Sequence, residues 1–352
     1  MELTRTISEA LSQPLPATEH VVFALTPQEK DLFFASEPGI SQPSVRESWI
    51  DTTRIASGHW EEALRELRPT VLVTAWSCPP LPPAWTREDD CPLRYLCSVT
   101  GSVRSRVLRE MIEKGLLVTN WGSLVSPAVA EHAMLMALSL LRGQSFWPEL
   151  MDAPRSMFEM VPVLRSRTLR GKRVGLHGFG AVARELVSML QPFGVDLAAW
   201  SPGVPVAMLE EFGVRPCTGL AELFSHSEVL FECEGLNEQS CGSVTEAILR
   251  RLPDDAVFVN VGRGAVVDED ALAVLAGEGR LRVGLDVFQH EPLPPGSPLR
   301  GNPRVLLSPH VAGPIWENYP LCGAQALDNL AKYLRGEPPE NRVTLEIYDR
   351  AT

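Results

Sequence analysis

One stretch, residues 171–200, constrains the fold more than any other part of the chain. A short apolar run at 174–176 indicates a buried strand, and the glycine turn Gly178-Phe179-Gly180 follows it. Residues 195–200 indicate a second buried strand, with Gly194 as the left-handed cap before it. Between them, apolar residues recur with the spacing of one helix face, at Val182, Leu186, Met189 and Leu190. This order of elements predicts a βαβ unit of the dinucleotide-binding type.

Each small residue of the turn has a physical task. Gly178 permits the tight turn, and Gly180 lets the backbone approach a pyrophosphate bound by the N–H groups of the helix N-terminus. Ala183 stands at the third position of the G-x-G-x-x-G/A pattern. A glycine triplet alone is also typical of an ordinary strand-to-helix turn, but the flanking elements favour a cofactor site. We therefore predict that the dinucleotide contacts Gly178, Phe179, Gly180, Ala181 and Val182.

The position that usually selects the coenzyme holds an unusual residue. In such a unit an acidic side chain about 20 residues after the glycines binds the ribose 2′-hydroxyl. Here that position is Ser201, which cannot hold two hydroxyls as a carboxylate does and would not repel a 2′-phosphate. Pro202 and Gly203 follow, without an arginine to bind a phosphate. Ser201 is expected at the cofactor, and the choice between NAD(H) and NADP(H) stays open.

Composition narrows the class of protein. The chain of 352 residues is long enough for two domains, and its 45% apolar and 22% charged content is typical of soluble globular proteins. The net charge of −12 argues against nucleic acid or an anionic membrane as the main partner. Seven cysteines, an odd number, suit a reducing cytoplasm. The N-terminus lacks a signal-peptide pattern, and the longest apolar stretch, 133–141, is too short to span a bilayer.

Strand and helix patterns also alternate before the βαβ unit. We expect a helix at 103–114 and strands at 21–25, 71–75, 94–99 and 116–119. Ser126 as N-cap and Pro127 begin a nearly all-apolar helix, 128–141, which we expect to connect two domains. Residues 144–170 are expected to be irregular. The alternation predicts α/β domains with doubly wound parallel sheets.

A basic run lies just before the strand that leads to the glycine turn. It contains Arg165, Arg167, Arg170, Lys172 and Arg173. A subunit contact or a phosphate-binding role is conceivable for such a run. A solvated face is the more common structure for clustered charges, and we expect that here.

Three polar residues follow the ends of later strands. The expected strands 256–261, 283–287 and 305–308 lead to Arg263, Glu291 and His310, respectively. Ligands of an open α/β sheet bind at the carboxyl ends of its strands, so these side chains are expected at one site. An arginine can hold a carboxylate with two hydrogen bonds, and a histidine can exchange a proton near neutral pH. A glutamate beside the histidine would orient the ring and favour its protonated form.

This set of residue types suits reversible hydride transfer between a 2-hydroxy acid and a 2-keto acid beside a nicotinamide ring. Each residue alone has a structural alternative. His310 could be a hydrogen-bonded structural histidine, Arg263 a turn arginine, and Glu291 a cap before proline. Three such residues at strand ends in one dinucleotide-binding domain favour the catalytic interpretation.

Several motifs together resemble one enzyme family. They are AVAEHAM at 128–134, VGLHGFGAVA at 174–183, FVNVGRGAVVDEDAL at 258–272, GLDVFQHEPLP at 284–294 and LLSPHVAG at 306–313. In these motifs the chain resembles the D-isomer-specific 2-hydroxyacid dehydrogenases, the group that contains phosphoglycerate dehydrogenase, glyoxylate/hydroxypyruvate reductase and D-lactate dehydrogenase. The resemblance runs from about residue 94 to residue 336.

The resemblance implies roles for the polar residues. The family's catalytic arginine, glutamate and histidine fall on Arg263, Glu291 and His310, and its nicotinamide-carboxamide aspartate falls on Asp286. In the reducing direction Arg263 would hold the substrate, His310 would donate the proton, and Glu291 would keep the histidine protonated. Further cofactor contacts are implied at Cys233, Val261, Gly262 and Gly313.

The resemblance also implies an organisation. An outer substrate-binding domain, 1–122 with 316–352, would close on an inner Rossmann domain, 123–315, and exclude water from the reaction. Family members are usually homodimers, with the helix near Ala128 at the subunit contact. The implied partner is a small 2-keto or 2-hydroxy acid such as glyoxylate, hydroxypyruvate or pyruvate.

The chain departs from the family pattern in the loops. The substrate loop before the connector contains Thr100, Gly101, Ser102 and Val103, whose backbone N–H groups could still receive a carboxylate. Arg104 could add a contact for a larger anion, although a surface arginine at a helix start explains it equally well. Cys233 stands where the family usually has histidine. Trp76, Trp121 and Trp316 lie near the expected pocket loops, where core packing or a domain contact explains them at least as well as substrate binding.

Two other functions use the same scaffold. One is a dinucleotide-sensing regulator or corepressor, which the fold alone does not exclude. The other is an enzyme like formate dehydrogenase, which has glutamine at the position of Glu291, so Glu291 counts against it. No metal site is expected, because the histidines lack ligand spacing.

Overall fold

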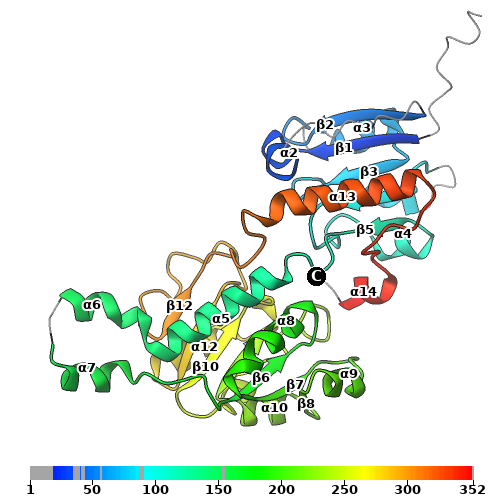
Figure 1. Cartoon of the computed structure of the whole chain (residues 1–352). Helices are drawn as coiled ribbons and strands as arrows, with labels where there is room; N and C mark the ends of the chain where they lie inside the picture. The colour runs from blue at the N-terminus through cyan, green and yellow to red at the C-terminus, as the bar shows by residue number, and fades with distance from the viewer. Residues whose placement is uncertain are drawn as a thin grey trace, which may run out of the picture. The chain divides into compact units, whose positions relative to one another are not determined.

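The computed structural model describes residues 19–34, 40, 44–55, 58–86, 91–152 and 155–350. The chain divides into two compact units, Met1–Leu124 with Trp316–Thr352, and Val125–Ile315 (Figure 1). Each unit contains one sheet in which all paired strands are parallel, which confirms the expected α/β class. The N-terminal residues 1–18, on which the absence of a signal peptide was judged, lie outside the described residues.

The first unit is built on a five-stranded sheet in the order β2-β1-β3-β4-β5. Its strands are β1 (Glu19–Leu25), β2 (Val45–Asp51), β3 (Val71–Thr74), β4 (Tyr95–Ser98) and β5 (Leu117–Thr119). Its helices are α2 (Pro27–Phe33), α3 (Trp60–Leu67), η1 (Pro83–Thr86), α4 (Arg109–Glu113), α13 (Asn318–Leu334) and α14 (Leu345–Arg350). A Cβ atom at Gly323 would lie 1.9 Å from the carbonyl oxygen of Phe33, so glycine is needed where α13 packs on α2.

The second unit is built on a seven-stranded sheet in the order β12-β11-β10-β9-β6-β7-β8. Its strands are β6 (Arg173–His177), β7 (Asp196–Trp200), β8 (Arg215–Pro216), β9 (Val229–Glu232), β10 (Ala256–Asn260), β11 (Leu281–Leu285) and β12 (Val305–Leu307). From β6 the chain first builds outward to β7 and β8, then returns to place β9 on the other side of β6. The order therefore reverses between β6 and β9, and such a switch point is where doubly wound sheets bind their ligands.

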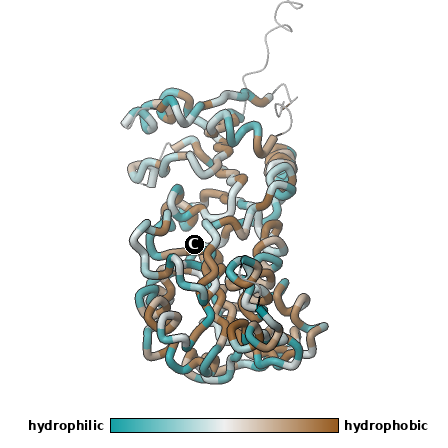
Figure 2. Tube along the Cα trace, turned by 90° about the vertical axis from the view of Figure 1, so that its left-hand side faces the viewer, coloured by the Kyte–Doolittle hydropathy of each residue, from teal (hydrophilic) through white to brown (hydrophobic). Residues whose placement is uncertain are grey.

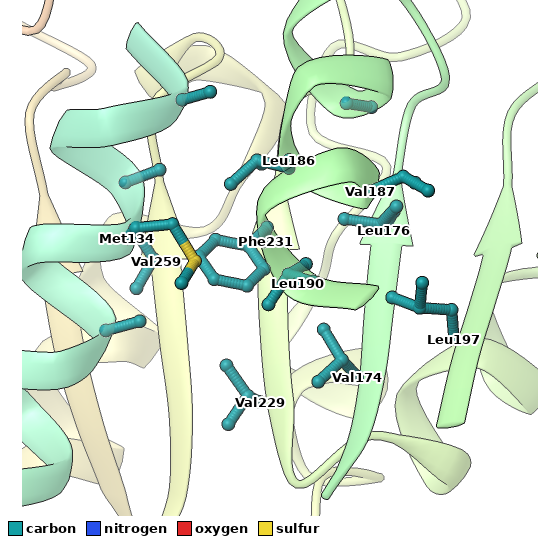
Figure 3. Close-up of a cluster of buried hydrophobic side chains, with 14 of the residues drawn as sticks. Met134, Val174, Leu176, Leu186, Val187, Leu190, Leu197, Val229, Phe231 and Val259 are labelled. Carbon is teal, nitrogen blue, oxygen red and sulfur yellow. The ribbon is translucent and has the colours of Figure 1, made fainter. Parts of the chain in front are cut away.

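Helices cover both faces of the second sheet. They are α5 (Ser126–Arg142), η2 (Gln144–Phe146), α6 (Trp147–Asp152), α7 (Met157–Leu164), α8 (Ala181–Leu190), η3 (Gln191–Phe193), α9 (Val206–Glu211), α10 (Leu220–His226), α11 (Glu246–Leu249), η4 (Gly264–Val266) and α12 (Glu269–Gly277). Side chains of α5 and α8 pack with those of β6, β9 and β10 into one core, where Met134 and Phe231 face Leu186 and Leu190 (Figure 3). The hydropathy colouring of Figure 2 shows hydrophobic stretches alternating with hydrophilic ones along the trace, as expected for buried elements joined by polar loops.

The structure corrects the expected helix 103–114, of which only Arg109–Glu113 is helical. The buried guanidinium of Arg106 explains the difference. It donates hydrogen bonds to Thr100 Oγ1 at 2.9 Å, to the Ala75 carbonyl at 3.1 Å and to the Ser102 carbonyl. These bonds hold the segment after β4 as a loop. The expected N-cap is also wrong, because Val125 is the cap and Ser126 is the first, buried helical residue.

Residues 144–170 were expected to be irregular, but they contain α6 and α7. A capping box begins α7, in which Ser156 and Glu159 satisfy each other's backbone N–H groups. The basic run is not simply a solvated face either. Lys172 lies 2.7 Å from a carboxylate oxygen of Glu228, and Arg167 forms a half-buried ion pair with Asp255 at 3.7 Å.

Candidate active site

The glycine turn after β6 forms a cradle at the switch point. Gly178 has φ 87°, and a Cβ atom there would lie 2.6 Å from the backbone nitrogen of Glu234, so the turn needs glycine for two reasons. Gly180 is the N-cap of α8, without a side-chain cap and with nothing within 4 Å of its ideal Cβ position. Uncapped N–H groups beside open space fit the pyrophosphate of a dinucleotide. Ala181 and Val182 begin α8, whereas Phe179 is buried against Phe212.

The residue at the expected ribose position has a partner that the sequence did not reveal. The Ser201 hydroxyl donates a hydrogen bond of 2.9 Å to Oε2 of Glu234, which follows β9. Burial is the largest effect on the pKa of the Glu234 carboxyl and raises it. A carboxylate therefore lies next to Ser201, although it comes from a different strand end.

The other predicted cofactor residues, Cys233, Val261 and Gly262, lie in the loops after β9 and β10, next to the glycine turn. The Cys233 N–H donates to the His177 carbonyl at 2.8 Å, and burial raises the pKa of the Cys233 thiol well above its usual value. This thiol is not an activated nucleophile. Val261 is buried, and a Cβ atom at Gly262 would lie 2.9 Å from the Glu234 carbonyl oxygen. Gly262 therefore permits the close approach of the two loops.

Glu291 links the predicted catalytic arginine and histidine. Its Oε2 lies 2.6 Å from Nδ1 of His310, and its Oε1 accepts a hydrogen bond of 3.1 Å from the Phe288 N–H. Burial lowers the pKa of Arg263, and the charge of Glu291 opposes that effect. His310 has φ 54°, a left-handed conformation that only a few per cent of non-glycine residues adopt. The site thus holds its histidine in a strained backbone conformation.

Asp286 anchors the loop that carries His310. Its Oδ1 accepts hydrogen bonds from the Ser308 hydroxyl at 2.6 Å and from the Val311 N–H at 2.9 Å. Its Oδ2 accepts one from the Ala312 N–H at 3.0 Å. The three donors leave one acceptor position on a carboxylate that has about four. The predicted contact with the nicotinamide carboxamide therefore remains compatible with this geometry and stays a prediction.

The side chains of His132 and Asn260 also support these loops, and sequence reasoning missed both. His132 Nε2 lies 2.9 Å from the Ser308 hydroxyl and 3.6 Å from Asp286 Oδ1. The side chain of the buried Asn260 accepts a hydrogen bond of 3.0 Å from the Gly262 N–H at its Oδ1 and donates one of 3.1 Å from its Nδ2 to the Arg263 carbonyl oxygen. Both lie inside motifs that carry the family resemblance, AEH and VNVGRG, which was the available signal. Gly313 is structural in part, because a Cβ atom there would lie 2.6 Å from Val125 Cγ1.

The predicted substrate loop belongs to the other unit, at the carboxyl end of β4. The side chains of Thr100 and Val103 are buried, so only backbone groups and Ser102 are available to a ligand. Gly101 packs against the Trp121 ring, whose Nε1 would lie 2.6 Å from a Cβ atom. Trp121 in turn packs edge-on against the partly exposed Trp76, with ring centroids 6.2 Å apart.

The remaining residues singled out in the sequence have different surroundings. The Arg104 guanidinium lies 5.3 Å from the centre of the Tyr348 ring. The Trp316 side chain is 79% exposed. Among the described residues, no group of three or more His, Cys, Asp or Glu side chains could hold a metal ion. None of the helices there has the length and apolar content needed to cross a membrane.

Comparisons with known proteins point to one family. The model of the D-isomer specific 2-hydroxyacid dehydrogenase NAD binding domain matches residues 134–312. A glyoxylate reductase of Aeropyrum pernix is 29% identical over 240 residues, which cover 66% of this chain and 71% of that protein. A D-3-phosphoglycerate dehydrogenase of Methanocaldococcus jannaschii is 27% identical over 234 residues, 66% of this chain and 44% of that protein. The crystal structure of a glyoxylate reductase from Paecilomyes thermophila superimposes with a TM-score of 0.73, at 18% identity, over 93% of this chain and 98% of that one.

Proposed function

The chain belongs to the D-isomer specific 2-hydroxyacid dehydrogenase family, and on that basis we propose that it transfers a hydride between a nicotinamide dinucleotide and a small 2-keto or D-2-hydroxy acid. The observation that carries this proposal is the hydrogen-bonded pair of His310 and Glu291, 2.6 Å apart, with Arg263 in the field of the same glutamate. A regulator that only senses a dinucleotide does not need a proton donor held in a strained backbone conformation.

In the proposed mechanism each residue acts through a stated atom. Arg263 binds the substrate carboxylate and polarises the adjacent carbonyl, for which its planar fork of donors is suited. Glu291 holds Nδ1 of His310, which leaves Nε2 to give a proton to the developing alkoxide and to take it back in the oxidising direction. The coenzyme, when bound, supplies or accepts the hydride.

Different predicted cofactor residues would bind different parts of the dinucleotide. The α8 N-terminus, with Gly178 and Gly180, would bind the pyrophosphate. The loops after β9 and β10, including Cys233, Val261 and Gly262, would line the path towards the nicotinamide, and Asp286 would receive its carboxamide through the remaining acceptor position. The backbone N–H groups of Gly101 and Ser102 would receive the substrate carboxylate on the other unit.

We place the substrate among small 2-keto acids such as glyoxylate or hydroxypyruvate. The support is the similarity to a glyoxylate reductase and to a glyoxylate/hydroxypyruvate reductase B of Yersinia enterocolitica. The odd number of cysteines, seven, supports the proposed cytoplasmic location, where thiols stay reduced.

We also propose that the protein is a homodimer. Most of the expected contact helix, α5, is buried within its own unit. On α5 itself Leu135 is 59% exposed, and a cluster of large exposed apolar side chains lies further along, on α6 and α7, which project from the end of α5 away from the sheet (Figure 1). They are Trp147, Met151, Met157, Phe158 and Val161. An exposed apolar surface of this kind usually marks a protein contact, so a second copy of the chain would cover this helical pair.

The test is a screen that follows the absorbance of NADH and NADPH with a panel of 2-keto acids. Wild-type protein should consume at least one coenzyme with one of these acids. His310→Ala should reduce kcat by about 100-fold or more, since a positioned acid contributes that much. Binding of either coenzyme without turnover on any acid would refute the dehydrogenase proposal and favour the sensor function.

A further inference from the structure

Four loops meet at the carboxyl ends of β6, β7, β9 and β10. The Gly178 backbone lies directly against Glu234, since a Cβ atom there would be 2.6 Å from the Glu234 nitrogen. Ser201, at the end of β7, reaches the Glu234 side chain with its hydroxyl at 2.9 Å. Gly262, after β10, is also close, since a Cβ atom there would lie 2.9 Å from the Glu234 carbonyl oxygen. Glu234 is therefore enclosed by residues that the dinucleotide pattern assigns to the pyrophosphate and to the ribose.

A buried ion pair fixes the backbone beneath Glu234. His177 Nδ1 lies 2.5 Å from Glu232 Oε2, and both side chains are buried. Burial alone would lower the pKa of His177, but the adjacent Glu232 carboxylate raises it, and the net change is upward. The second oxygen of Glu232 receives the Glu234 N–H at 2.9 Å, and the Trp200 ring stacks on His177. The hydrogen bond from the Glu234 N–H to Glu232 thus fixes the backbone of Glu234 to the buried His177–Glu232 pair.

The Glu234 carboxylate has acceptor capacity beyond the bonds from the Ser201 hydroxyl and the Gly235 N–H, since a carboxylate has about four acceptor positions. It is only partly buried, so it can be reached by a ligand. Two vicinal hydroxyls are the ligand that such a carboxylate binds at a dinucleotide site. A phosphate ester on one of them would bring a second negative charge against the first in partly desolvated surroundings, which is unfavourable.

We propose that Glu234, positioned by Ser201 and by the His177–Glu232 pair, holds the ribose hydroxyls of the adenosine half of the coenzyme, so that the chain binds NAD(H) in preference to NADP(H). The proposal rests on the dinucleotide site of the proposed function. It moves the coenzyme-selecting carboxylate from the end of β7, where Ser201 stands, to the end of β9. Ser201 then acts as a positioning residue, which explains why it is neither acidic nor followed by arginine.

Direct binding tests the proposal without any substrate. Isothermal titration would give the Kd of NADH and of NADPH for wild type, Glu234→Gln and the control Glu238→Gln, which changes an exposed carboxylate of the same loop. Wild type should bind NADH about 100-fold more tightly than NADPH. In Glu234→Gln the Kd for NADH should rise and that for NADPH should fall, which reduces the ratio about tenfold or more. Glu238→Gln should keep the wild-type ratio.

The opposite changes in the two Kd values distinguish coenzyme selection from damage to the fold, because damage to the fold would weaken the binding of both coenzymes. Equal binding of the two coenzymes by wild type, or a ratio that Glu234→Gln leaves unchanged, would overturn the proposal while leaving the dehydrogenase intact. If wild type bound neither coenzyme, the proposed function itself would fail. Ser201→Ala should shift the ratio in the same direction as Glu234→Gln, by a smaller factor.

Discussion

Replacing Asp286 by asparagine tests whether this carboxylate anchors the His310 loop. The substitution keeps the shape of the side chain and removes its charge. The amide oxygen can still accept from Ser308 and from the Val311 N–H. The amide nitrogen then faces the buried Ala312 N–H, so that two donors meet where a hydrogen bond of 3.0 Å existed.

The cost follows from these contacts. Losing a hydrogen bond to a charged acceptor and leaving its N–H buried costs about 2–3 kcal/mol. Changing the acceptor of the two remaining bonds from charged to neutral adds about 1 kcal/mol. The free energy of unfolding should fall by about 3–4 kcal/mol, and the Tm by roughly 6–15 °C for a unit of this size. The protein should still fold, because the free energy of unfolding of a domain is usually about 5–15 kcal/mol.

Urea unfolding followed by circular dichroism measures the loss, and Ser308→Ala is the matched control. That variant removes one donor to the same carboxylate and the partner of His132 Nε2, but it leaves both backbone N–H groups paired, so it should cost only about 1–2 kcal/mol. Because the loop carries His310, kcat of Asp286→Asn should also fall by about 100-fold. A stability loss no larger than that of Ser308→Ala would refute the reasoning, since Val311 and Ala312 would then have found other acceptors.

Three further changes test other parts of the structure. Burial is the largest single effect on the pKa of Asp255 and raises it, but the hydrogen bonds and charges of the neighbouring arginines, Arg282 and Arg304 among them, together lower this pKa overall. The resulting stability exists above the ordinary aspartate pKa, about 4, and is lost as the pH falls through the lowered value. Asp255→Asn should therefore cost about 2 kcal/mol in urea unfolding at pH 7 and less at pH 3, whereas an equal cost at both would contradict the pairing. Gly178→Ala, strained by φ 87° and by contact with Glu234, should weaken NADH binding at least about tenfold in titration; unchanged binding would exclude the turn from the coenzyme site. Phe158→Ser, at a side chain 89% exposed, should yield monomers in sedimentation, and the exposed control Val274→Ser should not; a dimer that survives Phe158→Ser would place the contact elsewhere.

Local patterns were sufficient for the elements around the glycine turn. The apolar spacing from Val182 to Leu190 is that of α8, and the cap at Gly194 has the left-handed φ of 61° that the sequence predicts. These features depend on neighbours within a few residues.

The failures have non-local causes. The loop 100–106 is held open by Arg106, whose partner Ala75 is 31 residues away. The pairing of Ser201 with Glu234 spans 33 residues, so no pattern around Ser201 could show that a carboxylate lies beside it. Helices α6 and α7 were not predicted from the sequence. Periodicity identifies a helix by one apolar face that packs on the rest of the chain, whereas most of the large apolar side chains of these two helices are exposed.

The placement of α13 in the first unit has a consequence for synthesis on the ribosome. This helix packs on α2 and β4, and Cys97 in β4 donates to the Ala326 carbonyl of α13 at 3.4 Å (Figure 1). About 200 residues separate the end of β5 from the end of α13, which takes roughly 10–40 s to translate. During that time the whole second unit, Val125–Ile315, is synthesised, and most of it leaves the ribosome and can begin to fold. The first unit is thus completed only after the second has been synthesised, and its sheet lacks the cover of α13 until then.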